Sequence, residues 1–227
     1  MTETQTIPQN TNTSSIPMLK AMVGIGVLCA LLIVLTFEGT LPRIERLKAE
    51  ALEKAIFRVL PGTVATKTFQ LDQNNGFTEV SAKDAAEPLV YVGYDQKGQL
   101  TGVAVEASGQ GYADVLRILY GYHPDKQAII GFYVLESKET PGLGDKIEKD
   151  ADFLANFKAL DVSLTDDFSE LKNAVVPVKQ GSKEHPWQVD GITGATISSR
   201  AIGNIIGTST QNWVPLIFNN QRDFTSD

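Results

Sequence analysis

The feature that most constrains this chain is an uncharged apolar run at residues 21–37, close to the N-terminus. As a helix rising about 1.5 Å per residue, the run extends roughly 26 Å, and it spans a bilayer once residues 18–20 are added and the Lys20 ammonium reaches the interface. A cleaved signal peptide is the alternative. However, the polar leader is long and no small-x-small cleavage site follows the run. We therefore expect an uncleaved transmembrane helix embedded in a lipid bilayer.

The apolar run divides the chain into four expected parts. Residues 1–17 are polar and predict a disordered tail, residues 18–37 the transmembrane helix, residues 38–62 a juxtamembrane helix and linker, and residues 63–227 a single folded domain. More lysines and arginines closely follow the run than precede it, so charge alone favours a cytoplasmic position for the folded domain.

The folded part mixes strand and helix patterns. Strand-like runs occupy residues 89–94, 100–105, 128–135 and 174–178, with a hairpin loop after the first. Helical patterns occupy residues 43–60, 151–160 and 195–207. Because hairpins and separate helices occur together, we expect an α+β domain rather than a doubly wound parallel sheet.

Composition excludes several kinds of chemistry. The net charge of −7 repels nucleic acid phosphates, so we expect no nucleic acid partner. The only cysteine, Cys29, lies in the apolar run, which excludes an intrachain disulfide and any cluster or zinc site held by cysteines of this chain alone. His123 and His185 each precede proline and are interpreted as turn residues, so we expect no metal site. Neither a Walker loop nor a G-x-S-x-G elbow occurs, so ATP binding and hydrolysis have no support.

A hydroxyl-rich segment, DGITGATISSR at residues 190–200, stands at the start of the last predicted helix. The free N–H groups and the dipole of a helix start favour an anion such as phosphate, and Gly194 and Ala195 leave the backbone open to close approach. The alternative is an ordinary helix start with Thr193 as its N-cap. Local chemistry alone leaves both interpretations open.

This segment resembles the flavinylation motif Asp-x-x-[Ser/Thr]-Gly-Ala-Thr-x-[Thr/Ser] of membrane electron-transfer subunits, which carry FMN as a phosphoester. A second segment, ETPGLGDKI at residues 139–147, is similar to the other signature of the same family. That family is the FMN-binding G-type subunit of Rnf complexes, with its Nqr counterpart. The resemblance implies a single-pass anchor followed by an FMN-binding domain on the periplasmic side of a bacterial inner membrane, opposite to the side that charge favours.

The resemblance also implies the site. The last hydroxyl of the motif, which receives the FMN phosphate, is Ser198, where threonine is commoner. Ser199 is a competing hydroxyl, and Asp190 is either the leading acid of the motif or a turn residue. A separate flavin transferase that uses FAD and magnesium carries out the attachment. The residues expected to hold the covalent FMN are Ser198, Thr193, Gly194, Ala195, Thr196, Glu139, Thr140, Gly142 and Leu143.

Four further expectations concern side chains near these segments. Thr196 is, like Ser199, a competing attachment point. Glu139 either contacts the polar edge of the flavin or is a solvated loop carboxylate. Tyr112, Tyr120 and Trp187 are interpreted as core aromatics and left outside the site.

The function implied is that of a redox subunit, not catalytic alone, in an ion-translocating complex that passes electrons between ferredoxin and NAD. Other subunits would supply the iron–sulfur centres, the nicotinamide chemistry and the ion path. Two alternatives stay open: a membrane-anchored FMN-binding regulatory or sensor module, and the equivalent subunit of a sodium-pumping NADH:quinone reductase. A flavin that survives denaturation distinguishes an electron carrier from a reversible sensor.

Overall fold

The computed structural model describes residues 15–73, 75–81 and 88–225, so residues 1–14 of the expected tail lie outside the described part. The chain divides into two compact units, residues 1–49 and 50–227. Helix α1 (Ile16–Val59) begins two residues before the expected transmembrane boundary at residue 18. It runs without a break through the predicted juxtamembrane helix and ends just before Pro61.

The N-terminal part of α1 exposes its apolar side chains. Its most apolar window has a mean hydropathy of 2.5, and none of that window is buried inside the protein. Leu28, Leu31 and Leu32 are each more than half exposed. By length and composition, this part of α1 is able to cross a membrane.

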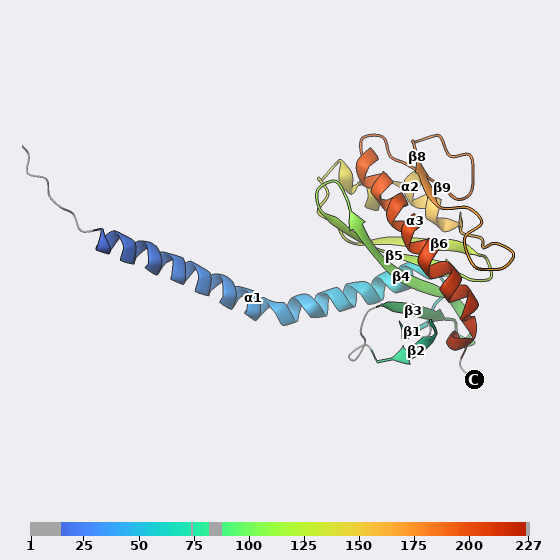
Figure 1. Ribbon diagram of the computed structural model, residues 1–227, viewed down its shortest axis with the longest axis horizontal. Helices are drawn as coiled ribbons and strands as arrows, with labels where there is room; N and C mark the ends of the chain where they lie inside the picture. The colour runs from blue at the N-terminus through green and yellow to red at the C-terminus, as the bar shows by residue number, and fades with distance from the viewer. Residues whose placement is uncertain (1–14, 74, 82–87, 226–227) are drawn as a thin grey trace, which may run out of the picture. The chain divides into compact units, whose positions relative to one another are not determined.

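A seven-stranded antiparallel sheet forms the centre of the second unit (Figure 1), in the order β2-β1-β3-β4-β5-β6-β7. Its strands are β1 (Ala65–Leu71), β2 (Phe77–Val80), β3 (Leu89–Tyr94), β4 (Leu100–Gln110), β5 (Val115–His123), β6 (Ala128–Glu136) and β7 (Leu160–Asp161). The predicted strands at residues 89–94 and 128–135 are confirmed, and the predicted strand at residues 100–105 continues to Gln110. The α+β prediction is confirmed as well.

Opposite faces of the sheet are covered by two helices. The long helix α3 (Thr196–Asn219) packs on one face, and the last turns of α1 pack on the other, where Ile56 and Val59 meet Leu119. The α1 side requires two glycines, because a Cβ on Gly121 or Gly131 would overlap the carbonyl oxygen of Val59. The C-terminal turns of α1 are therefore part of the folded second unit.

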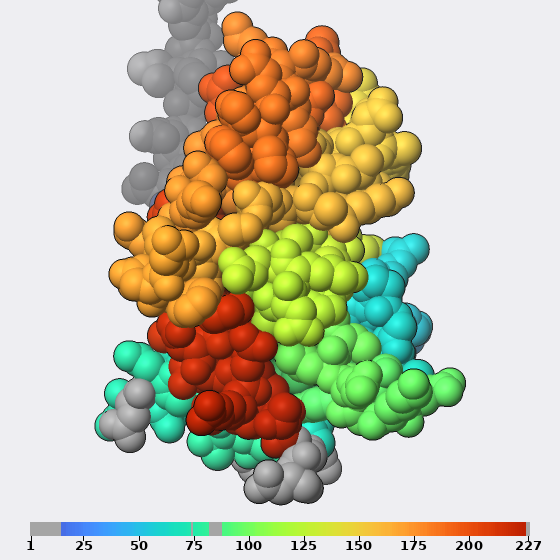
Figure 2. Space-filling view, turned by 90° about the vertical axis from the view of Figure 1, so that its right-hand side faces the viewer, coloured from blue at the N-terminus to red at the C-terminus, as the bar shows by residue number. Residues whose placement is uncertain are grey.

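A second, parallel pair of strands, β8 (Val176–Val178) and β9 (Gln188–Asp190), lies beside α3. Figure 2 shows the segment between β7 and α3, in orange, as a broad part of the domain surface. The strand predicted at residues 174–178 is shorter in the structure, because β8 begins only at Val176. The predicted helix at residues 195–207 is longer, because it continues through Pro215 to Asn219.

The predicted helix at residues 151–160 is wrong in its second half. The structure has α2 (Ala151–Ala155), then a 3₁₀ turn at Asn156–Lys158, and Leu160 already belongs to β7. The start is capped as a helix should be, with Asp150 accepting the N–H of Phe153. Asn156 then bonds across the fold to the Asp190 backbone, and these tertiary bonds accompany the early end of the helix. The other 3₁₀ segments are Gly144–Glu148 and Gln221–Phe224.

Candidate functional site

A cavity of about 340 Å³ brings together the two segments that the sequence singled out. The loop after β6 supplies one wall and the first turn of α3 supplies the other. The residues that line it are Tyr112, Glu139, Thr140, Leu143, Gly144, Gly194, Ala195, Thr196, Ile197 and Ser198.

The hydroxyl of Ser198 makes the central contact of this cavity. Its Oγ donates a hydrogen bond of 2.6 Å to Oε2 of Glu139, a residue 59 positions earlier in the chain. Both residues are buried, Ser198 at 3% exposure and Glu139 at 6%. Glu139 is therefore no solvated loop carboxylate, and the most buried hydroxyl of the cavity is the one that faces a carboxylate.

Backbone groups hold the Glu139 carboxylate in place. Its Oε1 accepts the N–H groups of Tyr112 at 2.8 Å and Ala113 at 3.1 Å, both from the turn between β4 and β5. A glycine is required on the other side, because a Cβ on Gly144 would stand 2.5 Å from Oε2. Gly111 likewise leaves room for Oε1. This carboxylate consequently has a fixed position, with Oε2 directed at Ser198.

The neighbouring hydroxyl of Ser199 is directed elsewhere. Its Oγ accepts the buried N–H of Ile192 at 3.1 Å and so fastens the loop before α3. Ser199 lines a different cavity of about 290 Å³, together with Thr193, Lys179 and Arg200. Thr196 lines both cavities and is exposed, and its Oγ1 makes only a long 3.4 Å bond to the carbonyl of Ile192.

The start of α3 is uncapped by side chains, so the alternative of Thr193 as N-cap is wrong. Ala195 is the N-cap residue and makes no side-chain cap bond. Gly194, at φ +86°, turns the chain so that the Thr193 N–H donates to Gln180 instead. The first helical bond runs from Ser199 N to Ala195 O, and the N–H groups of residues 196–198 precede it. With no acidic residue in the first turn, this helix start suits an anion.

Seven of the nine residues expected to hold the cofactor line the cavity, and Thr193 and Gly142 do not. Gly142 instead shapes the loop, since at φ +79° it donates its N–H to Asp145 and closes the turn that carries Leu143. Asp190 accepts the N–H groups of Gly181 and Ser182, which fits the turn-residue interpretation.

Sequence reasoning missed Tyr112, Gly144 and Ile197 as lining residues. Tyr112 is 64% exposed and lines the cavity, so its interpretation as a core aromatic is wrong. The Gly111-Tyr112 pair was the available signal, because a glycine at a strand end often marks close approach of another group. Tyr120, in contrast, is fully buried as expected, and burial raises the pKa of its phenol. Trp187 stacks on His185.

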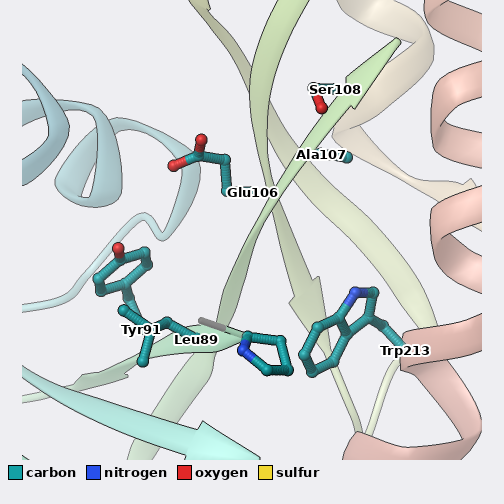
Figure 3. Close-up of a pocket in the computed structure, with 7 residues that line it drawn as sticks. Leu89, Tyr91, Glu106, Ala107, Ser108 and Trp213 are labelled. Atoms are coloured by element: carbon teal, nitrogen blue, oxygen red, sulfur yellow. The ribbon is translucent and has the colours of Figure 1, made fainter. Parts of the chain in front are cut away.

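A smaller cavity of about 180 Å³ lies elsewhere, beside β3 and β4. Figure 3 shows Tyr91 and Glu106 on one side of it and the indole of Trp213, from α3, on the other. Neither a hydroxyl-rich segment nor a helix start borders this cavity. Among the described residues, no group of three or more His, Cys, Asp or Glu side chains is placed to hold a metal ion.

Comparisons with known proteins cover the part of the chain that forms this cavity. Residues 111–210 match the family described as FMN-binding domain. The G-type subunit of an ion-translocating oxidoreductase complex from Methanosarcina acetivorans is 33% identical over 183 residues, which are 80% of this chain and 85% of that protein. The G-type subunit of the Na⁺-translocating ferredoxin:NAD⁺ oxidoreductase complex from Acetobacterium woodii is 32% identical over 138 residues, 59% of each chain.

Among solved structures, the C-type subunit of the Na⁺-translocating NADH-quinone reductase from Parabacteroides distasonis is similar in fold, with a TM-score of 0.59 and 23% identity. The match covers 82% of this chain and 98% of that chain. This likeness concerns the fold alone. The cavity between the β6 loop and α3 lies within the matched FMN-binding domain, since all ten of its lining residues fall between residues 111 and 210.

Proposed function

The chain belongs to the family of G-type subunits of ion-translocating oxidoreductase complexes, and on that premise we propose that it is the FMN-carrying electron-transfer subunit of a membrane-bound ferredoxin:NAD oxidoreductase complex. The observation that carries this proposal is the buried pair of Ser198 and Glu139 in the cavity of an FMN-binding domain. The protein transfers electrons and is not catalytic alone. Its partners are the other subunits of the complex.

The cavity fits FMN in its chemistry. Its volume of about 340 Å³ is in the range of ligand sites, and the open N–H groups at the start of α3 suit the phosphate. Three exposed side chains with large apolar surfaces line the cavity, Tyr112, Leu143 and Ile197. The isoalloxazine ring can pack against them. Thr140 lies beside them in the wall. When bound, FMN supplies one- and two-electron redox chemistry.

The attachment point is Ser198. Its hydroxyl lines the cavity and is paired with a carboxylate, whereas Ser199 is occupied with the Ile192 N–H on the other side of the helix. Thr196 is exposed and lacks such a carboxylate partner. The bond is a phosphoester, formed by a separate flavin transferase from FAD. A covalent link keeps the flavin in place through all of its redox states.

The membrane arrangement follows the family. The N-terminal part of α1 anchors the chain in the inner membrane, and the domain faces the periplasm, although charge alone favours the cytoplasm. A cysteine at the exposed Gln96, with Cys29→Ser, tests this orientation in intact cells. A membrane-impermeant thiol reagent should label it without lysis. Labelling only after lysis would place the domain in the cytoplasm.

Covalent attachment separates this function from the alternative of a reversible FMN sensor. The chain is coexpressed with a flavin transferase, denatured and examined for flavin fluorescence, beside Ser198→Ala and the matched variant Ser199→Ala. We expect fluorescence that survives denaturation in the wild type and in Ser199→Ala, and none in Ser198→Ala. A wild-type chain without flavin, while the transferase modifies a control substrate, would refute covalent attachment and favour the sensor.

A genetic test addresses the electron-transfer role. Cells that lack the native protein are complemented with the wild type or with Ser198→Ala, and ferredoxin:NAD oxidoreductase activity of their membranes is measured. We expect Ser198→Ala to assemble with the other subunits but to restore no activity. Full activity with Ser198→Ala would contradict the proposal.

A further inference from the structure

We propose that Glu139 is the proton acceptor for the attachment of the flavin to Ser198. The inference rests on the proposed function, because it assigns a chemical role within that attachment. It gives this chain, rather than the transferase alone, part of the machinery that activates its own hydroxyl.

The geometry of the pair suits proton transfer. A serine hydroxyl has one proton, and at Ser198 that proton is directed to Oε2 of Glu139 over 2.6 Å. The remaining lone pairs of Oγ are then free for attack on an electrophile in the cavity. A carboxylate is an acceptor only, so this hydrogen bond orients the nucleophile and receives its proton along the same line.

The carboxylate is also anchored independently of the serine. The Tyr112 and Ala113 N–H groups engage Oε1, which leaves Oε2 for Ser198. Gly144 makes this approach possible, because a Cβ there would stand 2.5 Å from Oε2 and 3.1 Å from the Ser198 Oγ. Rigid placement of a base within hydrogen-bond reach is what general-base catalysis requires.

No other side chain of the cavity takes this role. Among its lining residues, all of which belong to the described part of the chain, only Glu139 and Tyr112 are titratable. The side chain of Tyr112 is mostly exposed, and the bond between this residue and Glu139 comes from its backbone N–H. Glu139 is therefore the base that the chain itself presents to Ser198.

Attachment exchanges one bond for another at phosphorus. Ser198 Oγ forms a bond to the flavin-side phosphorus of FAD, and the bond from that phosphorus to the bridging oxygen breaks. AMP leaves with the electron pair, and the Ser198 proton passes to Glu139 and then to solvent. FAD and the divalent cation are supplied with the transferase. After the step, Oγ carries phosphorus instead of hydrogen, so Glu139 no longer has its hydroxyl donor.

Transferase kinetics with the full-length chain as the protein substrate test this role. Adduct formation is followed by flavin fluorescence after denaturation, with purified transferase, FAD and Mg²⁺. Glu139→Gln keeps a carbonyl oxygen for the Tyr112 and Ala113 N–H groups but presents an amide to Ser198. We expect kcat to fall by roughly 10²-fold or more, with KM for the chain and its thermal unfolding unchanged. Glu148→Gln is the control and should react like the wild type, because Glu148 is exposed and lies at the end of the 3₁₀ segment that follows the loop.

A second variant keeps the proposal open to refutation if Glu139→Gln folds poorly. Glu139→Asp retains a carboxylate on a shorter side chain and should react more slowly than the wild type but faster than Glu139→Gln. Equal loss in both variants, a wild-type kcat in Glu139→Gln, or a change in KM alone would overturn the proton-acceptor role. A wild-type chain that takes no flavin would instead overturn the covalent attachment itself.

Discussion

The two sides of the first turn of α3 carry adjacent serines with different tasks. On one side, the Ser198 hydroxyl donates a hydrogen bond to Glu139 in the cavity of the FMN-binding domain. On the other side, Ser199 accepts the N–H of Ile192 and fastens the loop that leads into the helix. Both side chains are buried and chemically identical. The segment that faces each serine decides its role, since one side offers a carboxylate and the other a backbone donor.

The positively charged side chains do not lie where phosphate binding by cations would place the flavin. Lys179 and Arg200 line the cavity on the Ser199 side, whereas the Ser198 side presents the Glu139 carboxylate and the open helix start. The lining cations would favour Ser199 as the attachment point, although the Lys146 ammonium also lies near Gly194 in the wall of the Ser198 cavity. The comparison of the two sides is therefore best tested by asking which serine takes the flavin.

The largest effect is expected from changes at Ser198. Ser198→Ala should lose the covalent flavin completely, and Ser198→Thr should keep it, because threonine presents the same hydroxyl group. Flavin fluorescence per mole of denatured protein measures both. Attachment of the flavin to Ser199 in the Ser198→Ala variant would show that the two serines are interchangeable, contrary to our account.

A large but incomplete effect is expected at Gly144. A Cβ there collides with Glu139, so Gly144→Ala should displace the carboxylate and slow attachment by roughly tenfold to a hundredfold. Gly98→Ala is the control, because Gly98 has open space around it and lies in the turn between β3 and β4, away from the cavity. Initial rates with purified transferase compare the two variants. Equal rates for Gly144→Ala and the wild type would show that the position of the Glu139 carboxylate does not affect flavin attachment.

An intermediate effect, on stability and not on attachment, is expected at Ser199. Ser199→Ala leaves the Ile192 N–H without its acceptor, which costs about 1–3 kcal/mol of unfolding free energy. Urea unfolding of the full chain in detergent measures this loss, and the denatured variant should still carry flavin. A stable variant without flavin would reverse the roles that we assign to the two serines.

The smallest effect is a pH dependence from His123 at the end of β5, outside both cavities. Burial, and then the charge of Lys126, lower the pKa of His123 below its usual value. The folded domain thus binds fewer protons than the unfolded chain, so this stabilisation is present above about pH 6.5 and is lost as pH falls through the folded-state pKa. The free energy of unfolding should therefore change less between pH 7 and pH 5 in His123→Gln than in the wild type.

The resemblance to a known family, carried by two short segments, predicted most of the walls of the site but not its central contact. The hydroxyl segment and the loop with Glu139 were both identified from sequence, and the structure places seven of the nine expected residues around one cavity. The bond between Ser198 and Glu139 depends on how β6 delivers its loop to α3. That is a tertiary property, which spacing along the chain does not encode.

The errors also have physical causes. Thr193 has the right chemistry for an N-cap, but the positive φ of Gly194 turns the chain and moves the cap to Ala195. Tyr112 was missed together with β5, since its place at the cavity depends on the turn between β4 and β5. The helix at residues 151–160 was overestimated because bonds between Asn156 and the Asp190 backbone compete with further helical turns.

The most direct measurement of the central claim is fragmentation mass spectrometry of the flavinylated tryptic peptide, residues 184–200. This peptide contains Ser198, Ser199 and Thr196, so a single spectrum compares both sides of the helix start. Our account expects the mass of FMN less one water on residue 198, with residues 196 and 199 unmodified. An adduct on Ser199 or Thr196, or an unmodified peptide from a chain treated with active transferase, would contradict it.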